Sequence, residues 1–174
     1  NKTEAIKILR NASDFGDGDA SLMIAMLSYM GETLPKDLKA AAKYFRRAAS
    51  CGSGMAMFYL GNLFDEGGYY KKDMDEAMRW YRLGAENGSD DAMTAIGVLY
   101  HNGSGVKTDF KEAAKWYKKA ADLDNTTALY NLALLYENGQ GVPKDMKEAV
   151  RLYKKAAQLG DEDAAKELKR LKVK

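Results

Sequence analysis

The chain has little cysteine, little proline and no long apolar run. Cys51 is the only cysteine among 174 residues, which excludes an internal disulfide and a disulfide-stapled secreted framework for this segment. Only two prolines, Pro35 and Pro143, interrupt a sequence rich in Ala, Leu, Met, Lys and Glu, residues that lose little freedom in a helix. No stretch approaches the roughly 18 apolar residues that span a bilayer. We therefore expect an all-α protein without membrane insertion.

Catalytic side chains are also scarce. His101 is the only histidine and is distant in sequence from Cys51, so the residues predict neither a catalytic triad, a Cys–His pair nor a zinc site. The loops NGSG and NGQG look like phosphate loops, but neither follows a strand or precedes Lys-Ser or Lys-Thr. The 27 basic and 25 acidic residues nearly balance, which gives no reason to expect a polyanionic partner. We expect no enzymatic activity, no cofactor and no metal.

What the sequence does contain is a repeat with a period of 36 residues and no insertions. Small residues and pairs of large residues recur at this spacing. They are Ala5, Ala41, Ala77, Ala113 and Ala149; Ala20, Ala56, Ala92, Ala128 and Ala164; Gly31, Gly67, Gly103 and Gly139; and Ile8-Leu9, Tyr44-Phe45, Trp80-Tyr81, Trp116-Tyr117 and Leu152-Tyr153. Such a repeat predicts supersecondary units that must stack, because one unit alone cannot bury its apolar face.

Each repeat divides into two helices, which we name A and B. In the second repeat helix A is predicted from Ala56 to Asp65, because Leu60 and Phe64 follow Ala56 at helical spacing. Helix B carries the pair of large residues, which we expect to fill the space between neighbouring hairpins. We predict a single domain made of a partial repeat with helix B only (1–16), four full repeats (17–52, 53–88, 89–124 and 125–160) and a C-terminal capping helix (161–174).

Both ends of helix B have sequence signals. Aspartates at the N-cap position are followed, in three repeats, by a glutamate that completes a capping box. The aspartates are Asp37, Asp73, Asp109 and Asp145, and the glutamates are Glu76, Glu112 and Glu148. Ala40 replaces the glutamate in the first repeat, so we expect that helix to begin less stably by a fraction of about 1 kcal/mol. The helix ends at Gly52, Gly88 or Gly160, and Asp124 substitutes once.

With these positions identified, the pattern resembles the Sel-1-like repeat, a relative of the tetratricopeptide repeat. Two stretches carry the resemblance, DAMTAIGVLYHNGSGVKTDFKEAAKWYKKAADLD and TALYNLALLYENGQGVPKDMKEAVRLYKKAAQLG. The resemblance implies a right-handed α-α superhelix, or solenoid, that acts as an adaptor in protein complexes, in bacterial host interaction or in endoplasmic-reticulum quality control. One departure concerns a loop, because Thr33 and Tyr69 replace the glycines found at 105 and 141. The loop of the second repeat should therefore differ and place Tyr69 and Tyr70 near the surface.

The same resemblance implies that helix A lines the concave side, so its residues off the packing face are candidates for binding a partner. We expect a protein or peptide partner and a monomeric domain. The candidate residues are Leu22, Met26, Tyr29, Phe58, Asn62, Asp65, Thr94, Val98, His101, Tyr130, Asn131, Leu134 and Glu137. They suit a peptide or helix held by apolar anchors and a few polar contacts. The alternative for Met26, Phe58, Val98 and Leu134 is that they simply pack between adjacent A helices.

Two other functions stay open from the sequence. The chain is either a structural spacer whose flanking domains carry the function, or a nucleic-acid binder through cations late in helix B. These cations are Arg46-Arg47, Arg82, Lys118-Lys119 and Lys154-Lys155. We prefer a structural interpretation of them, because cations in the last turn favour the helix dipole without any ligand.

The sequence leaves the cellular compartment open. Glycosylation-type sequences begin at Asn1, Asn11, Asn87, Asn102 and Asn125, which keeps a luminal location in the endoplasmic reticulum open. Loops, however, concentrate Asn, Gly, Ser and Thr for conformational reasons as well. We prefer a bacterial cytoplasmic, periplasmic or secreted protein.

Overall fold

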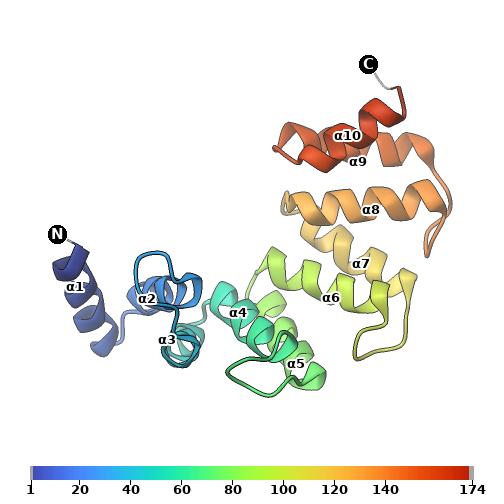
Figure 1. Ribbon diagram of the computed structural model, residues 1–174. Coiled ribbons are helices and arrows are strands. Elements are labelled where there is room, and N and C mark those ends of the chain that lie inside the picture. The colour runs from blue at the N-terminus through green and yellow to red at the C-terminus, as the bar shows by residue number, and fades with distance from the viewer. Residues whose placement is uncertain (1, 173–174) are drawn as a thin grey trace. The chain divides into compact units, whose positions relative to one another are not determined.

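The 36-residue period folds into consecutive helical hairpins, as the computed structural model of residues 2–172 shows (Figure 1). Over these residues the structure has helices and no strand, which confirms the all-α prediction and the hairpin repeat. The helices are α1 (Lys2–Asp14), α2 (Gly18–Met30), α3 (Leu38–Ser50), α4 (Gly54–Asp65), α5 (Met74–Glu86), α6 (Asp90–Asn102), α7 (Phe110–Ala121), α8 (Thr126–Asn138), α9 (Met146–Gln158) and α10 (Glu162–Arg170). Helix A of the four repeats is α2, α4, α6 and α8, and helix B is α3, α5, α7 and α9.

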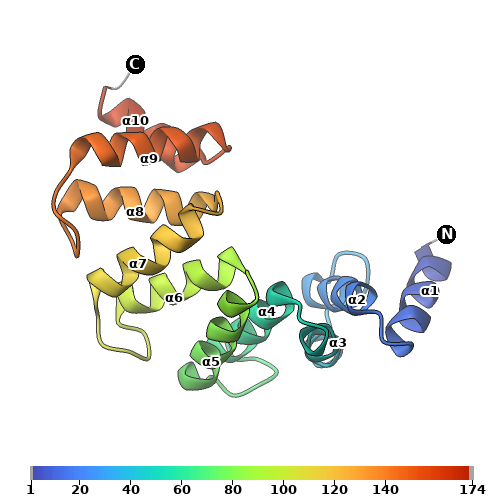
Figure 2. The same cartoon turned by 180° about the vertical axis from the view of Figure 1, so that it is seen from behind.

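The chain forms two compact units, Asn1–Ala92 and Met93–Lys174, which we describe separately. In unit 1, α2 packs on α3 and α4 packs on α5, and α3 also contacts α4. In unit 2, α8 packs on both α7 and α9, and α10 closes the end by packing on α9, as both views show (Figure 2). None of the helices in 2–172 combines the length and apolarity needed to cross a membrane.

The small and large repeat positions meet inside each hairpin. Gly61 on α4 lies against the Tyr81 ring of α5, where an added Cβ would come within 2.4 Å of the ring. Gly97 lies against Tyr117 in the same way, at 2.5 Å. In the four full repeats the second member of the large pair is enclosed, as Tyr81 is at 2 % exposure, whereas its neighbour Trp80 remains partly exposed; in the last repeat Leu152 is enclosed as well. Trp80 nevertheless packs against the core of unit 1, as expected of a residue between hairpins, and Trp116 is half-buried.

The four predicted aspartate caps of helix B are confirmed. Each carboxylate accepts from backbone N–H groups of the first turn, as Asp73 Oδ1 does from Glu76 at 3.0 Å. The prediction that the glutamates complete a capping box is wrong, because their side chains do not accept from the N–H of the aspartate. The backbone N–H of Asp73 already donates to the Phe64 carbonyl oxygen of helix A at 2.9 Å, and its three counterparts make the same bond. The glutamates instead form ion pairs one turn along the helix.

Helix A has N-caps that the sequence analysis did not identify. Ser53 Oγ accepts from the Ala56 N–H at 3.2 Å, so α4 begins two residues before the predicted start. The other caps are Asp17, Ser89, Asn125 and Asp161, each accepting from the alanine three residues later. The sequence signal, a Ser, Asp or Asn three residues before the recurring alanine, was present in every repeat. These bonds place the recurring alanine in the first turn, where it is buried at the contact between hairpins.

The helix ends behave as predicted. Gly52, Gly88 and Gly160 adopt φ values of +86°, +81° and +100°, and Asp124 adopts +64° in their place. The final helix is shorter than predicted, since α10 ends at Arg170, but it closes the array as a cap because Leu168 and Leu171 pack against the core of unit 2. Asn1, Val173 and Lys174, which the sequence predictions also included, lie outside the described residues.

Candidate partner-binding surface

Two A helices of unit 1 lie side by side through their aromatic residues. The Tyr29 ring of α2 meets the Tyr59 ring of α4 edge-on at a centroid distance of 5.3 Å. The Tyr29 hydroxyl also donates to the Glu66 carboxylate at 3.2 Å. The predicted residues Leu22, Met26 and Phe58 of these two helices are each half-buried, and Leu22 and Met26 pack against the core of unit 1.

The polar candidates are held by contacts within the chain. The Tyr81 hydroxyl donates to Asn62 Oδ1 at 2.8 Å and lies 3.3 Å from Asp65 Oδ2. In unit 2 the Tyr153 hydroxyl donates to Glu137 Oε2 at 2.9 Å, and Arg170 pairs with the same carboxylate. A hydrogen bond from a partner to the Asn62 side-chain oxygen would therefore compete with the bond that this oxygen already accepts.

The candidates of unit 2 also lie close to the core. Thr94 is 7 % exposed and does not belong to an accessible surface, which corrects its assignment. Val98, Tyr130 and Leu134 pack against the core cluster of this unit while staying partly exposed, as the packing alternative predicted for Val98 and Leu134. Asn131 is half-buried.

His101 also lies in this packed region. Its ring meets Phe110 edge-on at 5.2 Å, and Nδ1 is buried without a hydrogen-bond partner. No cluster of potential metal ligands accompanies it in the described part of the chain.

The most accessible apolar residues on the A helices are methionines that the sequence analysis left out. Met23 and Met30 on α2 are 53 % and 51 % exposed, and Met55 on α4 is 46 % exposed. Among the described A helices, only those of unit 1 carry large apolar side chains exposed to this extent. The composition held a signal, because five of the nine methionines occur in α2 and α4. We name Leu22, Met23, Met26, Met30, Met55 and Phe58 the methionine patch.

Acidic residues accompany the methionine patch on both helices. Asp19 is exposed on α2 and Glu66 is exposed just after α4, whereas half-buried Asp65 lies 3.7 Å from the Lys72 ammonium. Burial, with Glu66 as the second cause, raises the pKa of Tyr29 to about 12. Apolar residues with exposed acids at both ends of the patch suit a partner segment that has apolar anchors and basic flanks.

Three buried tyrosines of helix B have a raised pKa. Burial is the main cause of the raised pKa of Tyr81, Tyr117 and Tyr153. Hydrogen bonding to Glu137 raises the pKa of Tyr153 further, and the charge of Asp65 does so for Tyr81. All three rings are 2 % exposed or less, so ionisation would place a charge inside the hairpin.

We expect the protein to lose stability steeply above pH 10. Because the folded-state pKa of these tyrosines lies above the unfolded value, their contribution is complete below about pH 10 and is lost as pH rises toward the folded pKa. Each costs up to about 1.4 kcal/mol per pH unit in that window. Urea unfolding at several pH values measures the slope. Tyr117→Phe should make the slope shallower, and an unchanged slope would contradict this assignment.

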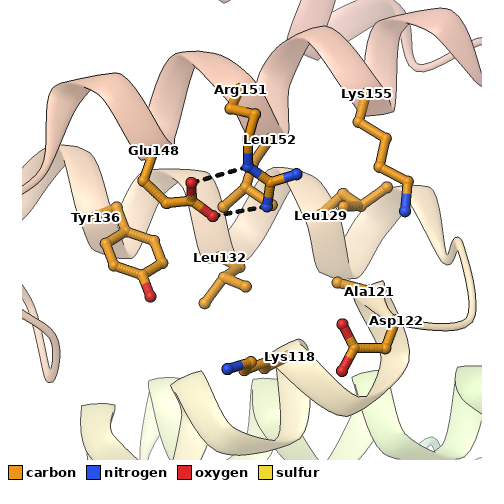
Figure 3. A pocket seen from close by; sticks show the side chains of 10 residues that line it. All are labelled: Lys118, Ala121, Asp122, Leu129, Leu132, Tyr136, Glu148, Arg151, Leu152 and Lys155. Carbon is orange, nitrogen blue, oxygen red and sulfur yellow. Dashed lines mark hydrogen bonds and ion pairs between the residues drawn. The ribbon is translucent and has the colours of Figure 1, made fainter.

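A pocket of about 240 Å³ lies between α7, α8 and α9 in unit 2 (Figure 3). Its basic side chains are largely matched by acids, since Arg151 pairs with Glu148 at 2.6 Å and Lys155 reaches Asp124 at 2.5 Å. Hydrogen bonding from Arg151 lowers the pKa of Glu148. Arg47 similarly pairs with Asp14 at 2.6 Å in unit 1. Arg47 and Lys155, which belong to the predicted ridge, thus pair with acids of the preceding repeat, which favours the structural interpretation over a phosphate-binding ridge.

Comparison with protein families gives one match that covers most of the chain. The model described as Sel1 repeat matches residues 18–53, 54–89, 90–125 and 126–161 in succession. These segments begin one residue after our predicted boundaries and each contains one complete hairpin. A search of curated proteins finds no match.

Several solved structures share this arrangement. A Sel1 repeat protein from Oxalobacter formigenes is 33 % identical with a TM-score of 0.93, and the match covers 100 % of this chain and 71 % of that one. A protective antigen of uropathogenic Escherichia coli with an SLR fold is 32 % identical (TM-score 0.85), over 94 % of this chain and 35 % of that one. Helicobacter pylori cysteine rich protein B is 30 % identical (TM-score 0.61), over 78 % and 97 %.

Proposed function

This chain belongs to the Sel1 repeat family, whose members mediate protein–protein interactions, and we propose that it is a non-enzymatic adaptor that binds a protein partner on the methionine patch. The family is one of interaction scaffolds rather than enzymes. In related superhelices the A helices line the concave side. The proposal places the principal contacts on α2 and α4 and leaves the residues of α6 and α8 a secondary role.

The observation that carries the proposal is the exposure of Met23, Met30 and Met55 on otherwise well-packed helices. Met23 and Met30 are seven residues apart on α2 and therefore lie on one face of the helix, and an exposed apolar face is a candidate interaction site. Methionine side chains are flexible and polarisable, so a methionine-rich surface adapts to the shape of a partner helix or peptide. The exposed acids at both ends of the patch then select partners with basic flanks.

The test compares proteins captured from lysate of the source cells by the wild type and by two double variants. Met23→Gln with Met55→Gln removes apolar surface from the methionine patch without adding charge. Leu123→Gln with Leu159→Gln is the matched control, because these leucines are 53 % and 47 % exposed outside the A helices. We expect capture of a specific partner to fall about tenfold with the patch variant and to stay unchanged with the control.

Equal capture by both double variants, with unchanged circular dichroism, would contradict the proposal. That result favours the alternative in which this segment is a spacer and flanking domains carry the function.

A further inference from the structure

A second pocket in unit 1 is built where two departures from the repeat pattern meet. It has a volume of about 700 Å³ and lies between α3 and the loop that joins α4 to α5. Lys39, Lys43 and Arg46 line it from α3, and Tyr69 and Tyr70 line it from the loop. None of these residues belongs to the methionine patch, so the pocket is a separate surface.

The first departure leaves the pocket positively charged. In the other three repeats the cation at the position of Lys43 pairs with a glutamate three residues earlier. These pairs are Arg79–Glu76 at 2.7 Å, Lys115–Glu112 at 2.5 Å and Arg151–Glu148 at 2.6 Å. The first repeat has Ala40 at the glutamate position, so that carboxylate is missing beside Lys43. Asp37 is the only acid lining the pocket, and its Oδ1 accepts from the Ala40 N–H at 2.9 Å.

The second departure supplies an aromatic wall. Tyr69 replaces the loop glycine, and the left-handed conformation moves to Gly68 with φ +109°. Tyr69 is 42 % exposed as predicted, whereas Tyr70 is half-buried because its ring stacks on Phe64 at 4.3 Å. Arg46 lies over the Tyr70 ring at 5.5 Å, and its Nε donates to the Tyr70 hydroxyl at 3.1 Å. The wall and one of the three cations are thus held in place before any ligand arrives.

We propose that this pocket binds an acidic segment of a partner protein, with carboxylates against Lys39, Lys43 and Arg46 and a neighbouring apolar or aromatic side chain against Tyr69. Three cations facing one acid provide the charge complementarity. The concave space with an aromatic wall accommodates a few side chains, which favours a peptide over an extended polyanion. The pocket of unit 2 differs in this respect, because Asp122 and Glu148 line it together with its cations.

The test uses defined probes and a variant that restores the missing acid. The first probe is the peptide acetyl-Asp-Glu-Phe-Asp-Glu-amide, and the second replaces its acids by Asn and Gln. Binding to the protein is followed by NMR titration. We expect the acidic probe to shift the signals of Lys39, Lys43 and Tyr69. The affinity of the amide probe should be lower by at least about fivefold.

Ala40→Glu is the decisive variant, because it introduces the residue present in the other repeats and favours the helix. We expect it to weaken binding of the acidic probe about fivefold. Lys144→Gln with Lys147→Gln, two exposed lysines in unit 2, is the matched control and should leave binding unchanged.

Equal affinity of Ala40→Glu and wild type for the acidic probe would overturn the proposal, and so would equal binding of both peptides. Tighter binding of an oligothymidylate probe at the same residues would also overturn it, since the ligand would then be a nucleic acid.

Discussion

Gly141→Ala is expected to lower the free energy of unfolding by about 3 kcal/mol, because the new Cβ meets both backbone strain and a backbone collision. Gly141 adopts φ +71°, a region that side-chain-bearing residues rarely occupy. A Cβ there would lie 2.2 Å from the carbonyl carbon of Phe110 and 2.6 Å from the backbone nitrogen of Lys111. Backbone atoms at the start of α7 cannot move aside as a flexible side chain could. Urea unfolding followed by circular dichroism measures the change.

Gly88→Ala separates the two causes. Gly88 has a similar φ of +81°, but no neighbouring heavy atom lies within 4 Å of its notional Cβ. This variant should suffer only the backbone strain, which lowers the free energy of unfolding by about 1 kcal/mol. If the two variants were equally destabilised, the contact between the loop and α7 would have no energetic role.

The repeat explains why the fold was predictable from the sequence. A residue type that recurs at one position in every unit reports a constraint common to all units, such as the close contact of Ala56 or the N-cap at Asp73. Several independent copies reveal the constraint, so the caps of helix B, the tight turns and the buried positions follow from comparing the repeats. The capping box was wrongly predicted because spacing along the chain does not show contacts between the two helices of a hairpin. The spacing of Asp73 and Glu76 does not reveal that the Asp73 N–H is already bonded to Phe64 across the hairpin.

The candidate site was less predictable, because partner binding depends on positions that vary between repeats. Periodicity placed Asn62 and Met23 on helix A but could not give their contacts. The structure shows Asn62 accepting from Tyr81, whereas Met23 extends into solvent. The basic pocket shows the same principle, since Ala40 matters only because later repeats have a glutamate there. Departures from the repeat were visible in the sequence, but their meeting at one pocket required the three-dimensional structure.

Tyr81→Ala should be among the most destabilising single substitutions in unit 1, at about 3–5 kcal/mol. The ring is 2 % exposed and lies against Gly61, which has no side chain that could fill the resulting cavity. Its loss also leaves Asn62 without the hydroxyl that donates to it at 2.8 Å. Chemical denaturation gives the total effect, and hydrogen exchange of α4 and α5 reports whether the loss is local, as expected for an array held by nearest-neighbour contacts.

Tyr81→Phe isolates the hydroxyl. It keeps the packing of the ring, and Phe45 already occupies the same repeat position on α3 with 0 % exposure. We expect this variant to cost about 1 kcal/mol, the usual net contribution of a hydrogen bond whose other partner can still reach water. A loss as large as that of Tyr81→Ala would show that the hydrogen bonds to α4, rather than the fit of the ring against Gly61, hold the hairpin together. In that case Gly61 would be required because it lets the Tyr81 hydroxyl approach Asn62. The part of the methionine patch on α4 would then depend on this hydrogen bond.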